Sequence, residues 1–226
     1  REAQRLATLT QKLGQDIKDI EWVMRTAYSL PLHNAEVDKV RVRTRMARLS
    51  DQAMQAGGLG RGLAEYGQGR GFLALHEYRD AEKHLQQALA AGLSLPELHF
   101  ALGQVLGELF SQALDEARRS GDKSFFLKRR KELEQELLVP ARAYLEKGRG
   151  LKTASTSYVD GLIDYYHERF EPALRHAQTA QQQISWQYEA IKLEGDVHMA
   201  RALERRDRGE YELAEKAFRE ALGRYA

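Results

Sequence analysis

Apolar side chains recur every three or four residues along most of the chain, which is the spacing of one face of an α-helix. In the first 29 residues the series is Leu6, Leu9, Leu13, Ile17, Ile20, Val23, Met24 and Ala27. Pro31 ends this predicted helix because the residue before a proline is pushed out of the helical region. A second helix is predicted over residues 35–56, before glycines at 57, 58 and 60 break the chain. Since no run alternates apolar and polar residues as a strand does, the pattern predicts an all-α protein.

Beyond these two helices the chain repeats one spacing. A small residue is followed nine residues later by an aromatic residue and twelve residues later by an alanine. Small residues allow two antiparallel helices to approach closely, and the aromatic residue anchors the turn between them. We therefore expect helix hairpins that stack on one another. The three sets are Gly69, Tyr78 and Ala81; Gly161, Phe170 and Ala173; and Ala202, Tyr211 and Ala214.

One further unit, which begins at Pro96, departs from this spacing. Gln112 and Asp115 stand where the other units have the aromatic residue and the alanine. We expect an enlarged hairpin over residues 96–148, with two long helices, the second of which Pro140 disturbs.

These units resemble the tetratricopeptide repeat family. Residues 208–222 match the second half of that repeat, and the 34 residues from Gly69 to Gly103 equal its length. The resemblance implies an irregular, right-handed solenoid of antiparallel helix hairpins. It also implies two parts: an N-terminal helical pair over residues 1–57, packing on an array of about four hairpins over residues 58–226.

Three short stretches, residues 20–33, 69–75 and 186–196, carry a second resemblance. They are similar to the non-catalytic repeat region that follows the catalytic domain in some bacterial serine/threonine protein kinases. This resemblance implies a cytoplasmic bacterial protein in which the module regulates a kinase or docks its partners. The chain starts at Arg1, within helix-forming sequence, and we expect it to be a piece of a longer protein.

The charges and composition exclude several classes of function. Lysine and arginine total 35 and aspartate and glutamate total 33, a balance that does not predict binding to nucleic acid or to an anionic membrane. The absence of cysteine excludes disulfides and thiolate metal sites. No apolar run approaches the roughly 20 residues that span a bilayer, and no signal peptide is visible.

No motif in the chain predicts catalysis, a metal or a cofactor. The kinase signatures His-Arg-Asp and Asp-Phe-Gly are missing, as are the Gly-x-Ser-x-Gly elbow and His-Glu-x-x-His. Gly69-x-Gly71-x-x-Ala74 superficially fits a dinucleotide fingerprint, but no predicted strand precedes it. We expect these glycines to lie at close helix contacts, and we do not expect the chain to be an enzyme.

Two basic runs are candidates for charged partners. The run at residues 128–131 is followed at once by glutamates, so we expect it to form ion pairs along its own helix. The run over residues 39–48 is less compensated, and it is the better candidate for an acidic partner.

In a tetratricopeptide array the first helix of each hairpin lines a concave groove, and the resemblance carries seven groove positions onto this chain. Aromatic and arginine side chains in such a groove are common binding hot spots. We expect this groove to bind a protein, a peptide or the upstream domain of the same polypeptide. The alternative is that several of these side chains belong to the core between helices. The positions are Tyr66, Arg70, Phe100, Gln104, Tyr158, Leu162 and Tyr165.

Two other functions remain open at this point. The N-terminal helix carries a short heptad seam of Leu6, Leu13 and Ile20 flanked by Ile17 and Met24, which would suit a homodimer. A small-molecule sensor, whose groove encloses a ligand, is the second alternative.

Overall fold

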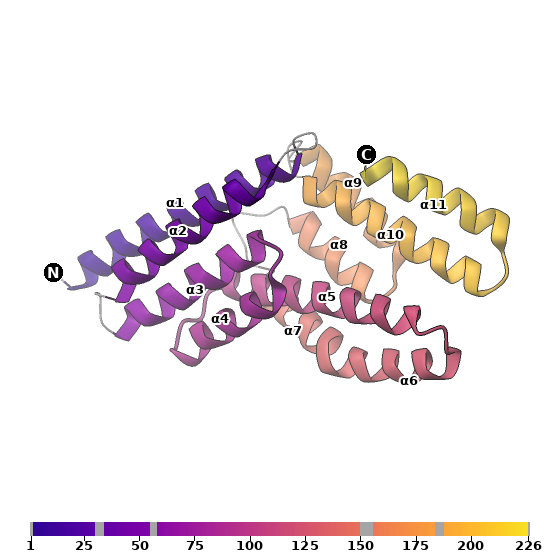
Figure 1. Ribbon diagram of the computed structural model, residues 1–226, viewed down its shortest axis with the longest axis horizontal. Coiled ribbons are helices and arrows are strands. Elements are labelled where there is room, and N and C mark those ends of the chain that lie inside the picture. Colours follow the sequence, from indigo (N-terminus) through magenta and orange to yellow (C-terminus); the bar gives the residue numbers. More distant parts are fainter. Residues whose placement is uncertain (1, 30–33, 55–57, 150–155, 184–187, 226) are drawn as a thin grey trace. The chain divides into compact units, whose positions relative to one another are not determined.

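The computed structural model describes residues 2–29, 34–54, 58–149, 156–183 and 188–225 (Figure 1). Throughout these ranges every regular element is a helix and no strand occurs, so the all-α prediction is confirmed. The chain divides into two compact units, Arg1–Ala141 and Arg142–Ala226, and each is described by itself. The predicted boundary between residues 57 and 58 falls within the first unit. The predicted helix stop at Pro31, and Trp186 in one of the kinase-like stretches, lie outside the described residues.

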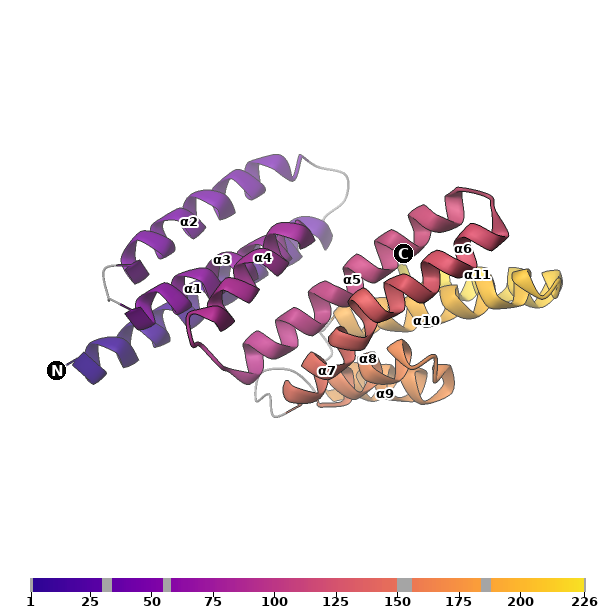
Figure 2. The same cartoon turned by 90° about the horizontal axis from the view of Figure 1, so that it is seen from below.

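The first unit is a series of helices in which each packs against the next along the chain (Figure 2). Contacts also join α1 to α3 and α3 to α5, the first helices of successive hairpins. Gly58 and Gly60 lie in α3 and not in a break, which corrects that expectation. The elements are α1 (Glu2–Ser29), α2 (Glu36–Met54), α3 (Gly58–Ala74), α4 (Tyr78–Ala90), α5 (Pro96–Arg119), α6 (Lys123–Leu133) and the π-helical η1 (Glu134–Leu138).

Glycines in α3 let its two neighbours approach closely. A Cβ atom on Gly69 would lie 2.5 Å from Cγ of Leu85 in α4. A Cβ atom on Gly71 would likewise come too close to the side chain of Met46 in α2. Ala81, which the repeat spacing placed at this crossing, is fully buried. The prediction that these glycines lie at helix contacts is confirmed.

The sequence explains where the two helices of the enlarged hairpin, α5 and α6, begin and where the second one is disturbed. Pro96 occupies the first turn of α5, where its missing N–H costs nothing. The Asp122 side chain caps α6 by accepting hydrogen bonds from the backbone N–H groups of Ser124 and Phe125, at 2.8 and 3.0 Å. Ahead of Pro140 the helix widens into η1, because a proline in a helix lacks a donor and collides with the carbonyl four residues earlier.

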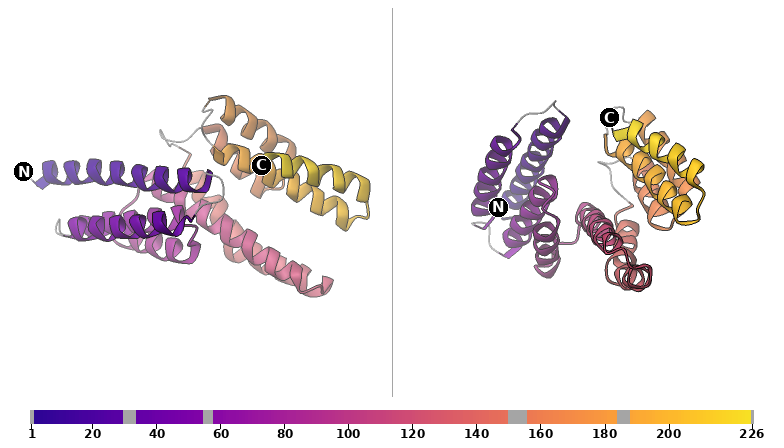
Figure 3. Two further views of the ribbon diagram at one scale, coloured as in Figure 1. Left: turned by 45° about the horizontal axis from the view of Figure 1, so that its top comes forward. Right: turned by 45° about the vertical axis from the view of Figure 1, so that its right-hand side comes forward.

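The second unit repeats the hairpin arrangement (Figure 3). Successive helices from α8 onward pack on one another, and α8 also contacts α10. Gly161 of α8 lies so close to α10 that an added Cβ would be 3.0 Å from Leu193. Arg142 donates to the carbonyl oxygen of Tyr166 at 2.8 Å, which ties α7 to the end of α8. The elements are α7 (Val139–Lys147), whose first three residues belong to the first unit, α8 (Thr156–Tyr166), α9 (Phe170–Gln183), α10 (Tyr188–Asp207) and α11 (Tyr211–Tyr225).

Helix length and hydropathy give no sign of a membrane span: none of the described helices combines the length and the apolar character needed to cross a bilayer.

Candidate functional site

The seven predicted groove residues are divided between the two units, and most are covered. Tyr66, Phe100, Tyr158 and Leu162 each retain only 7% of their accessible surface. The other three predicted residues are half-buried. Burial of the four favours the alternative that several of these side chains belong to the core.

Arg70 is bonded within the first unit. Its Nη1 donates to the Tyr66 hydroxyl at 2.8 Å, and its Nη2 donates to the carboxylate of Glu21 in α1. Burial opposes ionisation of Arg70, but Glu21 and the Tyr66 hydroxyl outweigh it, so the pKa of the guanidinium lies above its ordinary value. Burial likewise raises the pKa of Tyr66. An acidic ligand at Arg70 would have to displace Glu21.

Phe100 and Gln104 lie on α5, the first helix of the enlarged hairpin. Phe100 belongs to the continuous buried stretch of that helix, together with Ala101 and Leu102. Gln104 is half-buried and is the more accessible of the pair. The two positions therefore add little open surface to the predicted groove.

The α8 helix, which carries three of the predicted residues, also carries a buried carboxylate, Asp164. Asp164 forms an ion pair with Arg169 at 2.6 Å and accepts a hydrogen bond from Nδ1 of His176 at 2.9 Å. The Tyr165 ring lies 5.2 Å from that of Tyr166, measured between centroids. These contacts hold the turn between α8 and α9.

A histidine–carboxylate pair joins the two helices of three hairpins, a feature that the sequence analysis did not predict. Because the partners lie 12 to 22 residues apart, no local motif signals them. Each pair spans a hairpin and so contributes to its packing. The pairs are Glu65 with His84 at 2.7 Å, Asp164 with His176 at 2.9 Å, and His198 with Glu220 at 3.1 Å.

An open groove of about 830 Å³ lies between α1 and α2, entirely within the first unit. Its floor includes the buried side chains of Ile20, Val42 and Leu49. Its rim carries two large apolar side chains, Trp22 and Val40, that are 65% and 58% exposed. This hollow, and not the predicted set, is the accessible apolar surface of the first unit that we take as the candidate site.

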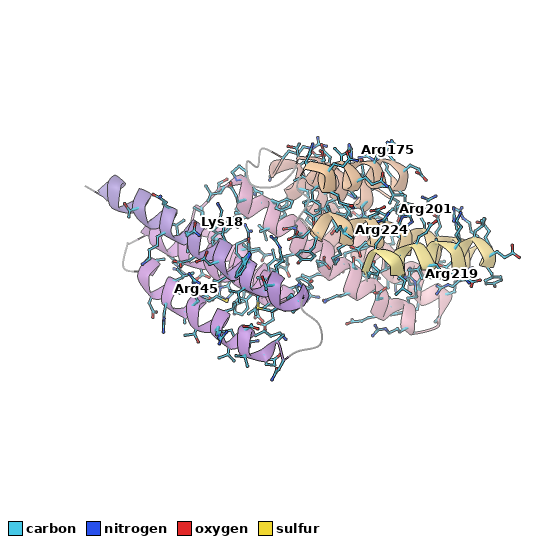
Figure 4. The ribbon with its side chains drawn as sticks, turned by 90° about the horizontal axis from the view of Figure 1, so that it is seen from above. Lys18, Arg45, Arg175, Arg201, Arg219 and Arg224 are labelled. Atoms are coloured by element: carbon cyan, nitrogen blue, oxygen red, sulfur yellow. The ribbon has the colours of Figure 1, made fainter. Side chains whose placement is uncertain are left out.

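Charged side chains surround this α1–α2 groove. Arg45 reaches from α2 to α1, where its Nη2 pairs with Asp16 at 3.0 Å and with Asp19 at 2.7 Å (Figure 4). Arg41 approaches Asp38 only to 3.4 Å and stays 73% exposed. Arg48 is exposed and forms no ion pair or hydrogen bond with any residue that the structure describes.

The basic run over residues 39–48 is thus more compensated than its sequence indicated. Lys39 pairs with Glu36 at 2.6 Å, and Arg43 pairs with Glu77 at the turn after α3. The cations that remain most available, Arg41 and Arg48, both line the α1–α2 groove.

The position of Trp22 in the sequence already indicates an exposed apolar residue at the α1–α2 groove. This residue is two positions from both Ile20 and Met24, or about 200° around an α-helix. Both of those neighbours are buried, so Trp22 must point away from the core.

Comparison of the chain with protein-family models, with characterised proteins and with solved structures finds no match.

Proposed function

We propose that the chain is a tetratricopeptide-like scaffold that binds a protein or peptide and catalyses no reaction. One observation carries the proposal: the first helices of successive hairpins contact each other, as α1 does α3 and α8 does α10. In a stack of hairpins each repeat touches only its neighbours, so the first helix of one hairpin contacts the first helix of the next. Such stacks commonly serve as binding surfaces.

The exposed apolar surface of the α1–α2 groove supports a binding role. The outer face of an amphipathic helix usually carries charged and polar residues. Trp22 and Val40 are instead more than half exposed at this end of the first unit. Exposed apolar side chains that gather around a hollow are typical of protein interaction sites.

The kinase context is part of the proposal and rests on the sequence resemblance. Gly69 in the second kinase-like stretch and Gly195 in the third both lie at close helix contacts. These stretches are therefore structural elements of a helical repeat region, which suits a regulatory or docking arm of a cytoplasmic bacterial serine/threonine kinase. The partner would be a docked protein or the kinase domain itself.

The heptad seam on α1 has less support as a dimer contact. Leu13, Ile17, Ile20 and Met24 are buried within the first unit. Pairing through them would require α1 to leave α2 and α3. The side chain of Leu6 lies outside the described part of the chain.

Selection from a random peptide display library on the whole chain tests the proposal. A scaffold should yield binders that a soluble copy of the same peptide displaces. A thermal-shift screen with nucleotides and common metabolites addresses the sensor alternative. Stabilisation by a metabolite, without any specific peptide, would contradict the proposal.

A further inference from the structure

The α1–α2 groove offers an apolar anchor point that its own chain leaves uncovered. Trp22 stands on the rim with 65% of its surface exposed, beside the half-buried Val23. Val40 of α2 lines the same groove and is 58% exposed. Tryptophan is the residue type most often found at binding hot spots, because a partner that covers it buries a large apolar area.

The charges around this anchor are unbalanced. Four basic side chains line the groove, and two acidic ones accompany them. Asp16 already pairs with Arg45 at 3.0 Å, whereas Arg41 stays 73% exposed and Arg48 is exposed. The rim therefore attracts acidic groups and repels basic ones. The lining charges are Lys12, Arg41, Arg45 and Arg48 against Asp16 and Asp38.

The dimensions of the groove fit a helix. On α1 the lining runs from Lys12 to Ala27, which corresponds to about 22 Å of helix at 1.5 Å per residue. A partner helix of about 15 residues has the same length. Two parallel ridges with an apolar floor form the groove into which an amphipathic helix places its apolar face.

We infer that the α1–α2 groove binds an acidic amphipathic helix of a partner protein, with its apolar face on Trp22 and Val40 and its carboxylates beside Arg41 and Arg48. This inference rests on the proposed function, because it names the surface and the partner class through which the scaffold acts.

A second copy of the chain and an anionic membrane fit the groove less well. The α11 helix, which has four exposed apolar side chains, carries acidic and basic residues in equal number, and α6, which has two, is strongly basic, so neither brings an acidic excess. A membrane would meet a hollow whose lining includes the carboxylates of Asp16 and Asp38. Membrane-surface sites instead present a convex basic face.

The test is a selection from a helical peptide library on the whole chain. Each peptide has about 15 residues, to match the groove, with apolar residues at positions i, i+3, i+4 and i+7. The flanking positions are randomised among glutamate, glutamine and lysine. Selected peptides are then measured by fluorescence anisotropy against the wild type and the double variant Trp22→Ala/Arg48→Glu. Circular dichroism checks the fold, and Val40→Glu, at a second exposed rim position, replaces the double variant if that variant melts early.

Matched controls come from the second unit. Tyr211→Ala removes an aromatic side chain that is 71% exposed, and Arg175→Glu reverses an exposed cation. Neither change should alter peptide binding.

The inference predicts glutamate-rich peptides that bind the wild type less tightly as salt is raised. Their affinity for the double variant should be at least tenfold lower than for the wild type. Peptides that bind the double variant equally well would overturn the inference and leave the scaffold proposal standing. Lysine-rich or uncharged binders would overturn the assignment of an acidic partner. Failure of both this library and the random library would overturn the inference and the scaffold proposal together. Binding to phosphatidylserine vesicles, or self-association of the free chain, would also contradict the inference if Trp22→Ala abolished it.

Discussion

Arg224, near the end of α11, forms a 3.0 Å ion pair with Glu194, a carboxylate that is 1% exposed within α10. The same carboxylate accepts hydrogen bonds from Gln178 at 3.3 Å and from Gln181 at 2.9 Å, both in α9. One buried charge thus holds three successive helices of the second unit together. Its neighbour Gly195 contacts the ring of Tyr225, so that a Cβ there would approach the ring to 2.6 Å.

Arg224→Ala should lower the free energy of unfolding by about 2 kcal/mol, because it leaves a buried carboxylate without its cation. Urea denaturation followed by circular dichroism measures the loss. The matched control is Arg219→Ala, which removes an arginine from the same helix. Its ion pair with Glu215 is solvent-exposed, so we expect a change below about 0.5 kcal/mol. Equal losses of unfolding free energy in the two variants would show that Glu194 does not hold α9, α10 and α11 together.

Gly69→Ala should destabilise the first unit, although alanine favours a helix by about 1 kcal/mol over glycine. The new Cβ would lie within 3 Å of two Leu85 side-chain atoms, and overpacking of this kind costs about 1–3 kcal/mol. Gly14→Ala is the control, since nothing within 4 Å obstructs a Cβ in that position of α1. We expect Gly14→Ala to raise the melting temperature and Gly69→Ala to lower it. An increase in both would rule out the close crossing of α3 and α4.

Tyr158→Ala should cost about 3 kcal/mol of stability, because the side chain is buried and its removal leaves a cavity. Tyr211→Ala, at an exposed position at the start of α11, should change the melting temperature little. Thermal unfolding of the two variants checks this. If Tyr158→Ala unfolded like the wild type, Tyr158 would be a solvent-facing groove residue after all.

Stability should depend on pH through Tyr225. Burial, and then the negative charge of Asp196, which accepts the Tyr225 hydroxyl at 2.7 Å, raise the pKa of this phenol above its ordinary value. Since the unfolded state loses its proton first, the stabilisation is complete below about pH 10 and is lost as pH rises further.

Urea denaturation of the wild type and Tyr225→Phe between about pH 8 and pH 11 measures this effect. We expect the advantage of the wild type to shrink above about pH 10. A constant difference across this range would mean that Tyr225 ionises as freely in the folded protein as in the unfolded chain.

The helix contacts were predictable from the sequence because small residues have a local signature. Gly69 and Ala81 lie twelve residues apart, and that spacing alone indicated the crossing that the structure has. Pro140 likewise indicated a disturbed helix. The π-helical form of the disturbance was not predictable, since it depends on how Leu137 and Leu138 reach the core.

The candidate site was harder to predict because exposure depends on which neighbours stack on a helix. Periodicity gives the direction in which Tyr158 points along α8, but not whether another helix covers that face. Trp22 is the opposite example. The helical period places this apolar residue on the side of α1 that faces away from the core. The repeat-family pattern assigns groove positions to the first helices of hairpins and assigns none to the outer face of α1 and α2.

Hydrogen–deuterium exchange of the whole chain, with and without a peptide selected for binding, tests the central claim most directly. If the chain is a scaffold that binds a helix through the α1–α2 groove, amides in residues 12–27 and 38–49 should exchange more slowly with the peptide bound. Exchange in α8 to α11 should be unchanged. Protection confined to those four helices, or no protection in a chain saturated with peptide, would contradict the account.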